Sequence, residues 1–504
     1  MTAPTQTLQE TRNNLAFLPR DIFWMILGYL APRDLVRCRR VSRCWNEAFG
    51  NPVILLPLVK KLFPWTKEVR DLQNGRSGVE DTRHGRRVFD QVASRYDHLE
   101  RGKPRSIQKY RLCDDFGTSG DREWFQVQPW ESHASHLRQI VDRQFSEALW
   151  SVEDGLLVYP SADDQCLVLM DLENDRRFMV PFTIRGKVVR RVRLQDRLLV
   201  VEWAEPKAFH WLNDSDGVHR HFASSFEVTR NANHGWSIIP RNEWKIMFLG
   251  HPLSERDRFF SAHSNTHYVI YIWQPNRSLY TADEDAPIES LFVWDISMPS
   301  SYRPSLDPTG RLREEESDQR PSIVSRFGFR DLEFFSVRQR GCPSIQRLEV
   351  TKDGQAVEIT ENICNWLTDE PPEPFGLPQT ITTSIPLTGH GPHWRRHSEF
   401  ILPPYRGNCS LQAMPLSFFA FLVESWFGVI AQVTDQEACL SFCLHFDPIN
   451  WAQDPTIYLS IQNPGSQATA ENLDFTGRGK ICGCERYLLG ENCNRELVIY
   501  RFDR

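Results

Sequence analysis

Length, composition and charge limit what this chain can be. Its 504 residues are too many for one small domain, so two or three domains are expected. Hydrophobic residues make up 40% of the chain and charged residues 25%, which is typical of a globular protein. The formal net charge of -6 provides no general attraction to nucleic-acid phosphates or to anionic membranes. Nucleic acid and membrane are therefore not expected partners.

Signals for export or membrane insertion are not found in the sequence. Met1 to Asn14 is polar and lacks the basic start and apolar run of a secretory signal. The longest apolar runs, Val53 to Val59 and Leu416 to Val423, are shorter than the roughly 20 residues that a membrane helix needs. The 12 cysteines lack the dense spacing of a disulfide scaffold. We expect an intracellular protein, cytoplasmic, nuclear or both, with residues 1–14 disordered.

The first patterned segment, Leu15 to Asn51, predicts three short helices. The first helix begins near Pro19, whose missing N–H costs nothing at a helix start, and it ends before Pro32. Its apolar positions share one helical face: Ile22, Ile26, Leu27 and Leu30. Three such helices bury little surface alone, so the unit is expected to need a partner.

The second and third helices follow directly. Asp34 to Val41 fits a helix with Leu35 and Cys38 inward, and Ser42 is a candidate N-cap for a third helix that carries Trp45 and Phe49. The arginines of this region are expected to form a solvated face and not a nucleic-acid site, because aromatic residues are not interleaved with them. They are Arg37, Arg39, Arg40 and Arg43.

Together these residues resemble the F-box consensus from end to end. The matching runs are Leu18-Pro19-Arg20-Asp21-Ile22, Ile26, Tyr29-Leu30, Pro32-Arg33-Asp34-Leu35 and Val41-Ser42-Arg43-Cys44-Trp45. The resemblance implies an F-box over residues 15–55 that binds a Skp-family adaptor and, through it, a cullin. It also implies that the adaptor contacts lie among Leu18, Pro19, Ile22, Ile26, Leu30, Leu35, Val41 and Trp45. The same residues could instead form the core of the module, and both roles can coexist in a module this small.

Residues 56–135 are expected to form a mainly helical connector. One apolar stripe consists of Leu55, Leu58, Val59 and Leu62, and a second consists of Phe89, Val92, Ala93, Tyr96 and Leu99. The polar stretch between them, Asn74 to Arg87, is interpreted as a loop.

Residues 136–504 change to the periodicity of strands. Gly155 to Pro160 and Cys166 to Asp171 predict a hairpin. Similar pairs recur along the chain: 198–203 with 208–212, 267–273 with 291–296, 428–433 with 440–446, and 481–489 with 497–502.

The repeated pairs favour a degenerate β-propeller. Several second strands end with an Asp beside an apolar residue, as WD-repeat blades do, but without the defining dipeptide: Asp171-Leu172, Asp295-Ile296, Phe446-Asp447 and Phe502-Asp503. Blades of about 40–50 residues would allow six to eight in this region. Loop insertions are expected at 299–321 and 370–404, and a β-sandwich is the alternative fold. The predicted fold class is therefore multi-domain, an α-helical N-terminal part followed by an all-β part.

Candidate metal and catalytic motifs are incomplete. His390, His393 and His397 with Cys409 do not promise four converging zinc ligands, and Asn213 to Gly217 lacks the later acidic residue of a calcium loop. Nucleotide-binding and hydrolase motifs are not found. We expect no cofactor, no metal site and no catalytic residue. Arg190, Arg191 and Arg193 are interpreted as a solvated strand edge.

The domain order predicts function. An F-box followed by a repeat domain is, as the resemblance implies, the layout of a substrate receptor of an SCF-type ubiquitin ligase, which holds an unknown target protein and is not itself an enzyme. The alternative is a non-degradative scaffold that is tethered through the same F-box. The two differ in whether the cullin joins the complex and whether a bound protein is ubiquitinated.

Overall fold

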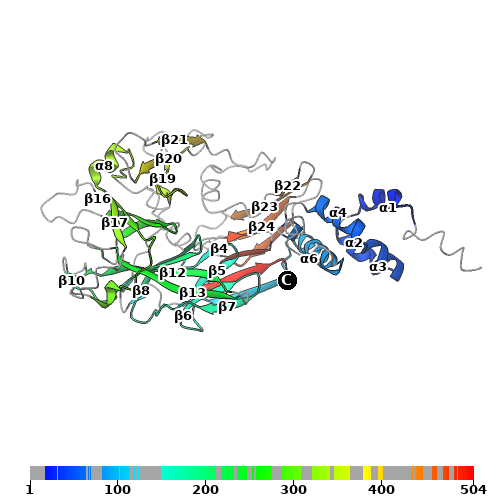
Figure 1. Ribbon diagram of the computed structural model, residues 1–504, viewed down its shortest axis with the longest axis horizontal. Coiled ribbons are helices and arrows are strands. Elements are labelled where there is room, and N and C mark those ends of the chain that lie inside the picture. Colours follow the sequence, from blue (N-terminus) through cyan, green and yellow to red (C-terminus); the bar gives the residue numbers. More distant parts are fainter. Residues whose placement is uncertain are drawn as a thin grey trace, which may run out of the picture.

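The computed structural model has a helical N-terminal part and a sheet-rich remainder (Figure 1). It describes residues 18–30, 32–63, 66, 68–69, 82–100, 103–113, 118–119, 122–123, 149–211, 217–231, 235–246, 253–254, 257–274, 287–307, 321–340, 345–363, 379–387, 395–400, 433–435, 438–446, 457–462, 469–475, 482–484 and 486–503. None of the helices within these ranges is long and apolar enough to span a membrane.

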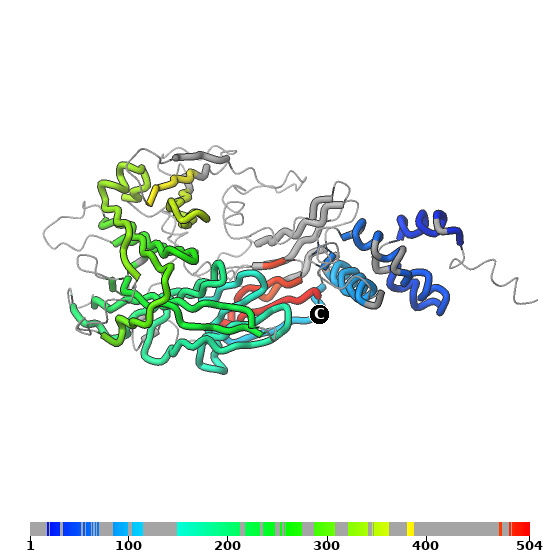
Figure 2. The backbone as a smooth tube through the Cα atoms, in the orientation of Figure 1, coloured from blue at the N-terminus to red at the C-terminus, as the bar shows by residue number. Residues whose placement is uncertain are grey.

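Five helices form what we call the helical unit. They are α1 (Arg20–Leu27), α2 (Pro32–Cys38), α3 (Arg43–Phe49), α4 (Pro52–Leu62) and α6 (Thr82–Glu100). The unit projects from one end of the molecule (Figures 1 and 2). The predicted loop at 74–87 is wrong for residues 82–87, which belong to α6, because the apolar stripe of α6 outweighs their polar composition.

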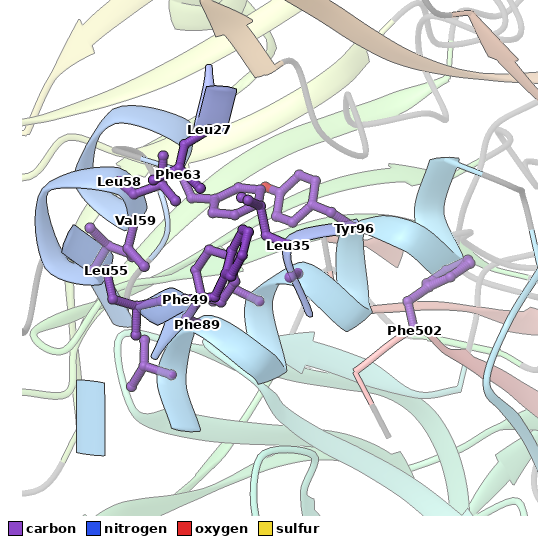
Figure 3. Close-up of a cluster of buried hydrophobic side chains, with 14 of the residues drawn as sticks. Leu27, Leu35, Phe49, Leu55, Leu58, Val59, Phe63, Phe89, Tyr96 and Phe502 are labelled. Carbon is purple, nitrogen blue, oxygen red and sulfur yellow. The ribbon is translucent and has the colours of Figure 1, made fainter. Parts of the chain in front are cut away.

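The helices share one apolar core, which Figure 3 shows in close-up. The stripe predicted in α6 is confirmed for the buried Phe89, Val92, Ala93 and Tyr96. Ser42 caps α3 as predicted, because its Oγ accepts a hydrogen bond from the Trp45 N–H at 3.2 Å. The core continues into the sheets through Phe502, so helices and sheets are packed against each other.

The structure shows how the predicted helix faces are used. In α1 Leu27 is buried together with Phe23, whereas Ile22 of the same predicted apolar face is exposed. Arg39, in the turn directly after α2, is predicted to point outward, and this is wrong: it is buried, because its guanidinium lies over the Phe89 ring and pairs with Asp90 of α6.

The sheet-rich domain contains, in its described part, six four-stranded antiparallel sheets that we number I to VI. Sheet I comprises β4 (Ser151–Glu153), β5 (Leu156–Ser161), β6 (Cys166–Asp171) and β7 (Arg176–Met179). Sheet II comprises β8 (Val188–Gln195), β9 (Leu198–Ala204), β12 (His221–Arg230) and β13 (Trp236–Lys245). Sheet III comprises β14 (Arg258–His263), β15 (His267–Gln274), β16 (Ile288–Asp295) and β17 (Ser322–Phe327).

The remaining sheets continue the same order. Sheet IV comprises β18 (Ile345–Val350), β19 (Ala356–Ile363), β20 (Gln379–Pro386) and β21 (Arg395–Phe400). Sheet V comprises β22 (Val433–Asp435), β23 (Ala438–Phe446), β24 (Ile457–Gln462) and β25 (Thr469–Leu473). Sheet VI comprises β26 (Cys482–Gly483), β27 (Tyr487–Glu491), β28 (Glu496–Arg501) and, from the other end of the chain, β1 (Ser106–Arg111).

Short elements decorate these sheets. β2 (Thr118–Ser119) pairs with β3 (Arg122–Glu123), and β10 (His210–Trp211) pairs with β11 (Gly217–Val218). The 3₁₀ turn η2 (Pro304–Leu306) and the helix α8 (Phe329–Phe334) lie before and after β17 in the chain.

Sheets I, II and III are apolar on both faces. In β5, Leu156 and Val158 face sheet II, while Leu157 and Tyr159 face sheet VI. The side chains of sheets II and III are divided in the same way, so that each sheet contributes to two apolar clusters. Continuous apolar runs such as Leu156 to Tyr159 form strands here because strands covered on both faces need no polar alternation.

The strand β1 lies within the segment 56–135 that is expected to be a helical connector. It pairs antiparallel with β28 over six residue pairs from Ser106 opposite Arg501 to Arg111 opposite Glu496. Figure 2 shows this light-blue strand beside the red C-terminal strands. Strands from the two ends of the sheet-rich domain thus share one sheet.

Most predicted strand pairs form, and the exceptions have physical reasons. The pairs β5 with β6, β15 with β16 and β27 with β28 are confirmed. The described part of the predicted partner 208–212, residues 208–211, does not pair with β9, which pairs instead with β8 and β12. The segment 370–404 is expected to be a loop insertion but contains β20 and β21. The β20 sequence QTITTSIP is rich in β-branched residues that favour strands despite their polarity.

Candidate functional site

The exposed surface of α1 is the most apolar part of the helical unit. We call the side chains of Leu18, Ile22, Met25 and Tyr29 the α1 apolar face. Met25 is 63% exposed and Tyr29 is 88% exposed. Ile22 and Met25 are three residues apart, so they lie on the same side of the helix, and Tyr29 follows in the turn after it. Large apolar side chains grouped in this way mark a surface that another molecule can cover.

The sequence-predicted contact residues divide into three groups. Leu18, Pro19, Ile22 and Val41 are exposed; Ile26, Leu30 and Trp45 are half-buried; and Leu35 is buried at 2% exposure. Leu35 is therefore a core residue that supports the surface from beneath. Sequence reasoning missed Met25 and Tyr29, although their spacing from Ile22 is the helical one that could have revealed them.

The α1 apolar face is held from behind by aromatic packing. Phe23, on the inward side of α1, meets Phe49 of α3 edge to face, with 4.9 Å between ring centroids. Trp45 stacks on the same Phe49 ring with centroids 5.4 Å apart. Aromatic pairs of this kind fix the relative position of helices beyond simple area burial. The short α1 is therefore presented as a rigid element.

Polar contacts join the first three helices to α6. The Arg39 Nη1 donates to the Asp90 Oδ1 at 2.6 Å, and burial lowers the pKa of Arg39 despite the opposing charge of Asp90. Arg86 of α6 donates to the Asn46 side chain of α3. The buried guanidinium of Arg39 depends on Asp90, because a buried charge without a partner is costly.

A charged cluster then joins the helical unit to the sheets. Glu68 accepts two hydrogen bonds from Arg95 of α6, at 2.8 and 3.2 Å, and a third from Arg486 at 2.7 Å. Arg486 also pairs with Glu173 of the turn after β6 at 3.3 Å. Burial alone would raise the pKa of Glu68, but Arg95 and then Arg486 outweigh it and lower this pKa to about 2.

A second polar cluster lies between sheets II and III. Arg190 and Arg191 are buried and not solvated as expected, and Arg191 donates to the Ser261 Oγ at 2.6 Å. Ser261 in turn donates to the Glu202 carboxylate at 2.5 Å. These contacts tie the strand β8 to β14 of the next sheet.

The candidate metal ligands named from the sequence lie mostly outside the residues that the structure describes. Within the described ranges, no group of three or more His, Cys, Asp or Glu side chains is arranged to hold a metal ion. His390, His393, Cys409 and residues 213–216 lie outside those ranges, and His397 lies in β21 opposite Thr382.

Comparison with known families identifies the helical unit. Residues 15–55 match the family model described as F-box-like, so the chain contains an F-box-like domain. Domains of this family generally bind Skp-family adaptors, and proteins that carry them are typically adaptors rather than enzymes. No curated protein matches the chain. The family match ends near the start of α4, so α6 lies outside it. Arg39 and Asn46, which are inside the match, therefore depend on contacts with residues beyond it.

Proposed function

We propose that this protein is the substrate-recognition subunit of an SCF-type ubiquitin ligase. The F-box-like domain binds the Skp-family adaptor through the α1 apolar face and Val41, and the adaptor brings a cullin. The sheet-rich domain holds the target protein. The chain then acts by proximity, because it raises the local concentration of the target beside the ubiquitin-charged enzymes.

The observation that carries this proposal is the exposure of the α1 apolar face. The helical unit already has a complete core in Phe23, Leu27, Leu35 and Phe49, so Met25 and Tyr29 are not needed for its folding. Leaving such side chains exposed is unfavourable unless a partner covers them. Their place in an F-box-like domain supports a Skp-family adaptor as that partner.

The sheet-rich domain, we further propose, is a six-bladed β-propeller. Three observations support it. The six sheets follow one another along the chain, consecutive sheets pack face to face from VI through I, II and III to IV, and the first strands of neighbouring sheets touch, as β4 and β8 do. In sheet VI, β1 occupies the outermost place beside β28, which would join the two ends of the ring.

The ends of the third strands agree with this proposal. Asp171 ends β6, accepts hydrogen bonds from the Glu173 and Asn174 N–H groups, and also bonds the Trp236 indole of sheet II at 2.9 Å. β16 ends on Trp294-Asp295, which is the dipeptide of WD-repeat blades, so the prediction that this dipeptide is missing is wrong for sheet III. In repeat blades such an Asp fixes the turn to the outer strand.

Reconstitution tests the proposal. We combine the full chain with the adaptor, the cullin–RING complex and a cell lysate that supplies target proteins. The ubiquitinated proteins are compared with those obtained with a Leu18→Ala, Pro19→Ala chain that still folds. We expect cullin recruitment and target ubiquitination with the unchanged chain only. Adaptor binding without a cullin or ubiquitination would mean a scaffold, and no adaptor binding would refute the proposal altogether.

A further inference from the structure

An ammonium group is held between two aromatic rings at the boundary of sheets I and II. The Lys187 Nζ lies 4.6 Å from the centre of the Trp203 ring and 4.7 Å from the centre of the Phe182 ring. The two rings are inclined at 66°, so they form two walls of a corner. A cation over the faces of two rings is attracted by both of their quadrupoles.

The walls of this corner are preorganised. The Trp203 N–H donates to the Ser224 Oγ at 2.9 Å, and Ser224 donates to Glu243 at 3.3 Å. Trp203 also stacks on Phe222 with ring centroids 4.7 Å apart. Glu243 is itself fixed, since its other oxygen accepts the Ser305 N–H at 2.9 Å. A cation-binding corner of this kind therefore persists whether or not Lys187 occupies it.

Lys187 is only loosely suited to the place it occupies. Its Nζ donates to the Thr183 carbonyl of its own loop at 3.1 Å, and no carboxylate of the described residues lies within ion-pair distance of it. Burial lowers the pKa of Lys187, and the more distant charge of Glu243 only partly opposes this effect. A primary ammonium loses strong hydration here for a single hydrogen bond.

The loop that carries Lys187 can release it. Gly186, the preceding residue, has a φ of +75°, and a side chain at that position would meet nothing within 4 Å. Arg185 and Gly186 are exposed, whereas Phe182 and Trp203 are buried. Withdrawal of this flexible side chain would uncover the parts of the two rings that its ammonium group covers, without moving a strand.

From this geometry we infer that Phe182, Trp203 and Glu243 form a binding site for a methylated ammonium group on a lysine side chain of a target protein, which Lys187 fills when no ligand is bound. A methylated ammonium keeps its charge, is weakly hydrated and needs no hydrogen-bond acceptor, so it suits a corner made of ring faces better than Lys187 does. That the ligand belongs to a ubiquitination target rests on the proposed function; the site itself does not.

The location suits a target that is held away from the adaptor. The loop 180–187 joins β7, the outermost strand of sheet I, to β8, the first strand of sheet II. Figure 1 shows β8 on the side of the sheet-rich domain away from the helical unit. A ligand bound there would not compete with the α1 apolar face.

Calorimetry with the full chain tests the inference without the adaptor, so its failure is separate from failure of the proposed function. The probe is a short peptide containing trimethyllysine, and the comparison peptides carry unmodified lysine or an uncharged isostere with a tert-butyl group. We expect Lys187→Ala to bind the trimethyllysine peptide about tenfold more tightly than the unchanged chain, because the internal competitor is gone. Lys352→Ala, which removes the same charge from an exposed turn of sheet IV, should match the unchanged chain.

Further arms separate a cation site from a merely apolar one. The uncharged isostere should bind the Lys187→Ala chain about tenfold more weakly than the charged peptide, and adding Phe182→Leu should reduce the affinity for the charged peptide. Choline replaces the peptide in a further arm. Weaker binding of choline than of the trimethyllysine peptide supports a protein side chain as the ligand, and tighter binding of choline would contradict it. Equal binding of the two peptides, or no binding to Lys187→Ala, would overturn the inference.

A second measurement uses the unchanged protein and does not depend on the folding of any variant. Acylation of individual lysines is followed by mass spectrometry with and without tetramethylammonium. Displacement of Lys187 from the aromatic corner should increase its acylation rate several-fold, whereas Lys352 should be unaffected. An unchanged rate at Lys187 would contradict the inference.

Discussion

Glu68 and Arg486 are 418 residues apart in the chain, yet their side chains are 2.7 Å apart where the helical unit meets sheet VI. This ion pair, with Arg95 also bound to Glu68, means that the helical unit, which contains the F-box-like domain, is packed against the sheet-rich domain and is not joined to it only by a loose linker. In the proposed ligase, the relative position of adaptor and target would then depend on these contacts.

The first prediction concerns this ion pair. Glu68→Gln should lower the free energy of unfolding by about 2–4 kcal/mol, because two partly buried guanidinium groups lose their carboxylate. Urea unfolding measures the change. The matched control is Asp154→Asn, whose carboxylate pairs with Arg197 at the surface and should contribute below about 1 kcal/mol. Equal effects of the two substitutions would contradict a structural role for Glu68.

The same pair has a defined pH dependence. The pKa of Glu68 falls from 4.5 to about 2 on folding, so its contribution is fully present above pH 4.5 and is lost as the pH falls towards 2. Between those values the unchanged protein should lose stability more steeply than Glu68→Gln. Parallel stability curves of the two proteins over this range would show that Glu68 is not held as described.

Two buried histidines predict a second acid effect at higher pH. Burial lowers the pKa of His263 to about 3, aided by the charge of Arg193, and it lowers that of His221, aided by Arg190. Because the unfolded side chains bind protons below about pH 6.5 and the folded ones do not, each histidine should reduce stability by about 1.4 kcal/mol per pH unit below that value. The contribution is therefore complete above pH 6.5 and is lost as the pH falls.

Thermal unfolding between pH 7 and 5 tests this effect. His263→Gln should give a flatter dependence of the unfolding temperature on pH than His210→Gln, a control at an exposed position in β10. If both variants keep the slope of the unchanged protein, His263 does not titrate as described.

The join between β1 and β28 predicts cooperative opening. Amide hydrogen exchange of residues 106–111 should be as slow as that of 487–501, because the two segments share one sheet. Ile499→Ala, which removes a fully buried side chain opposite Gln108, should cost about 2–5 kcal/mol and release both segments together. The exposed Ile107→Ala in β1 is the control. Rapid exchange of 106–111 in the unchanged protein would refute the join.

Arg39 predicts that the F-box-like domain depends on residues beyond its family match. Arg39→Ala removes the buried cation that covers the Phe89 ring and pairs with the half-exposed Asp90 of α6, so the free energy of unfolding should fall by about 1–3 kcal/mol. Arg37→Ala, at an exposed position of α2, should change it by less than about 0.5 kcal/mol. Circular dichroism in urea gives both values, and similar values would contradict the burial of Arg39.

Sequence alone predicted the helices of the F-box-like domain and the strands with long apolar runs. Both depend on local patterns: the capping of α3 by Ser42, and β-branched or apolar runs that are covered on both faces. It could not tell Ile22 from Phe23, because a partner-binding face and a core face are both apolar. Only the tertiary packing assigns one to the surface and the other to the interior.

Long-range contacts escaped prediction for a related reason. The burial of Arg39 and Arg191 depends on contacts with Asp90 and Ser261, which are far away in the chain. The residues next to each arginine in the sequence therefore do not reveal it. The placement of β1 beside β28 likewise has no local signal. The aromatic corner around Lys187 joins a loop to the neighbouring strand and could be found only from the structure.

The affinity of the purified Skp-family adaptor for the full chain tests the central claim most directly. The test variant is Ile22→Ala with Met25→Ala on the α1 apolar face. The control is Ile239→Ala with Met179→Ala, which removes the same residue types from exposed positions on sheets II and I. We predict that the test variant binds the adaptor at least about tenfold more weakly while the control binds normally. Equal binding by both, with both folded, would contradict the assignment of α1 as the adaptor-binding surface.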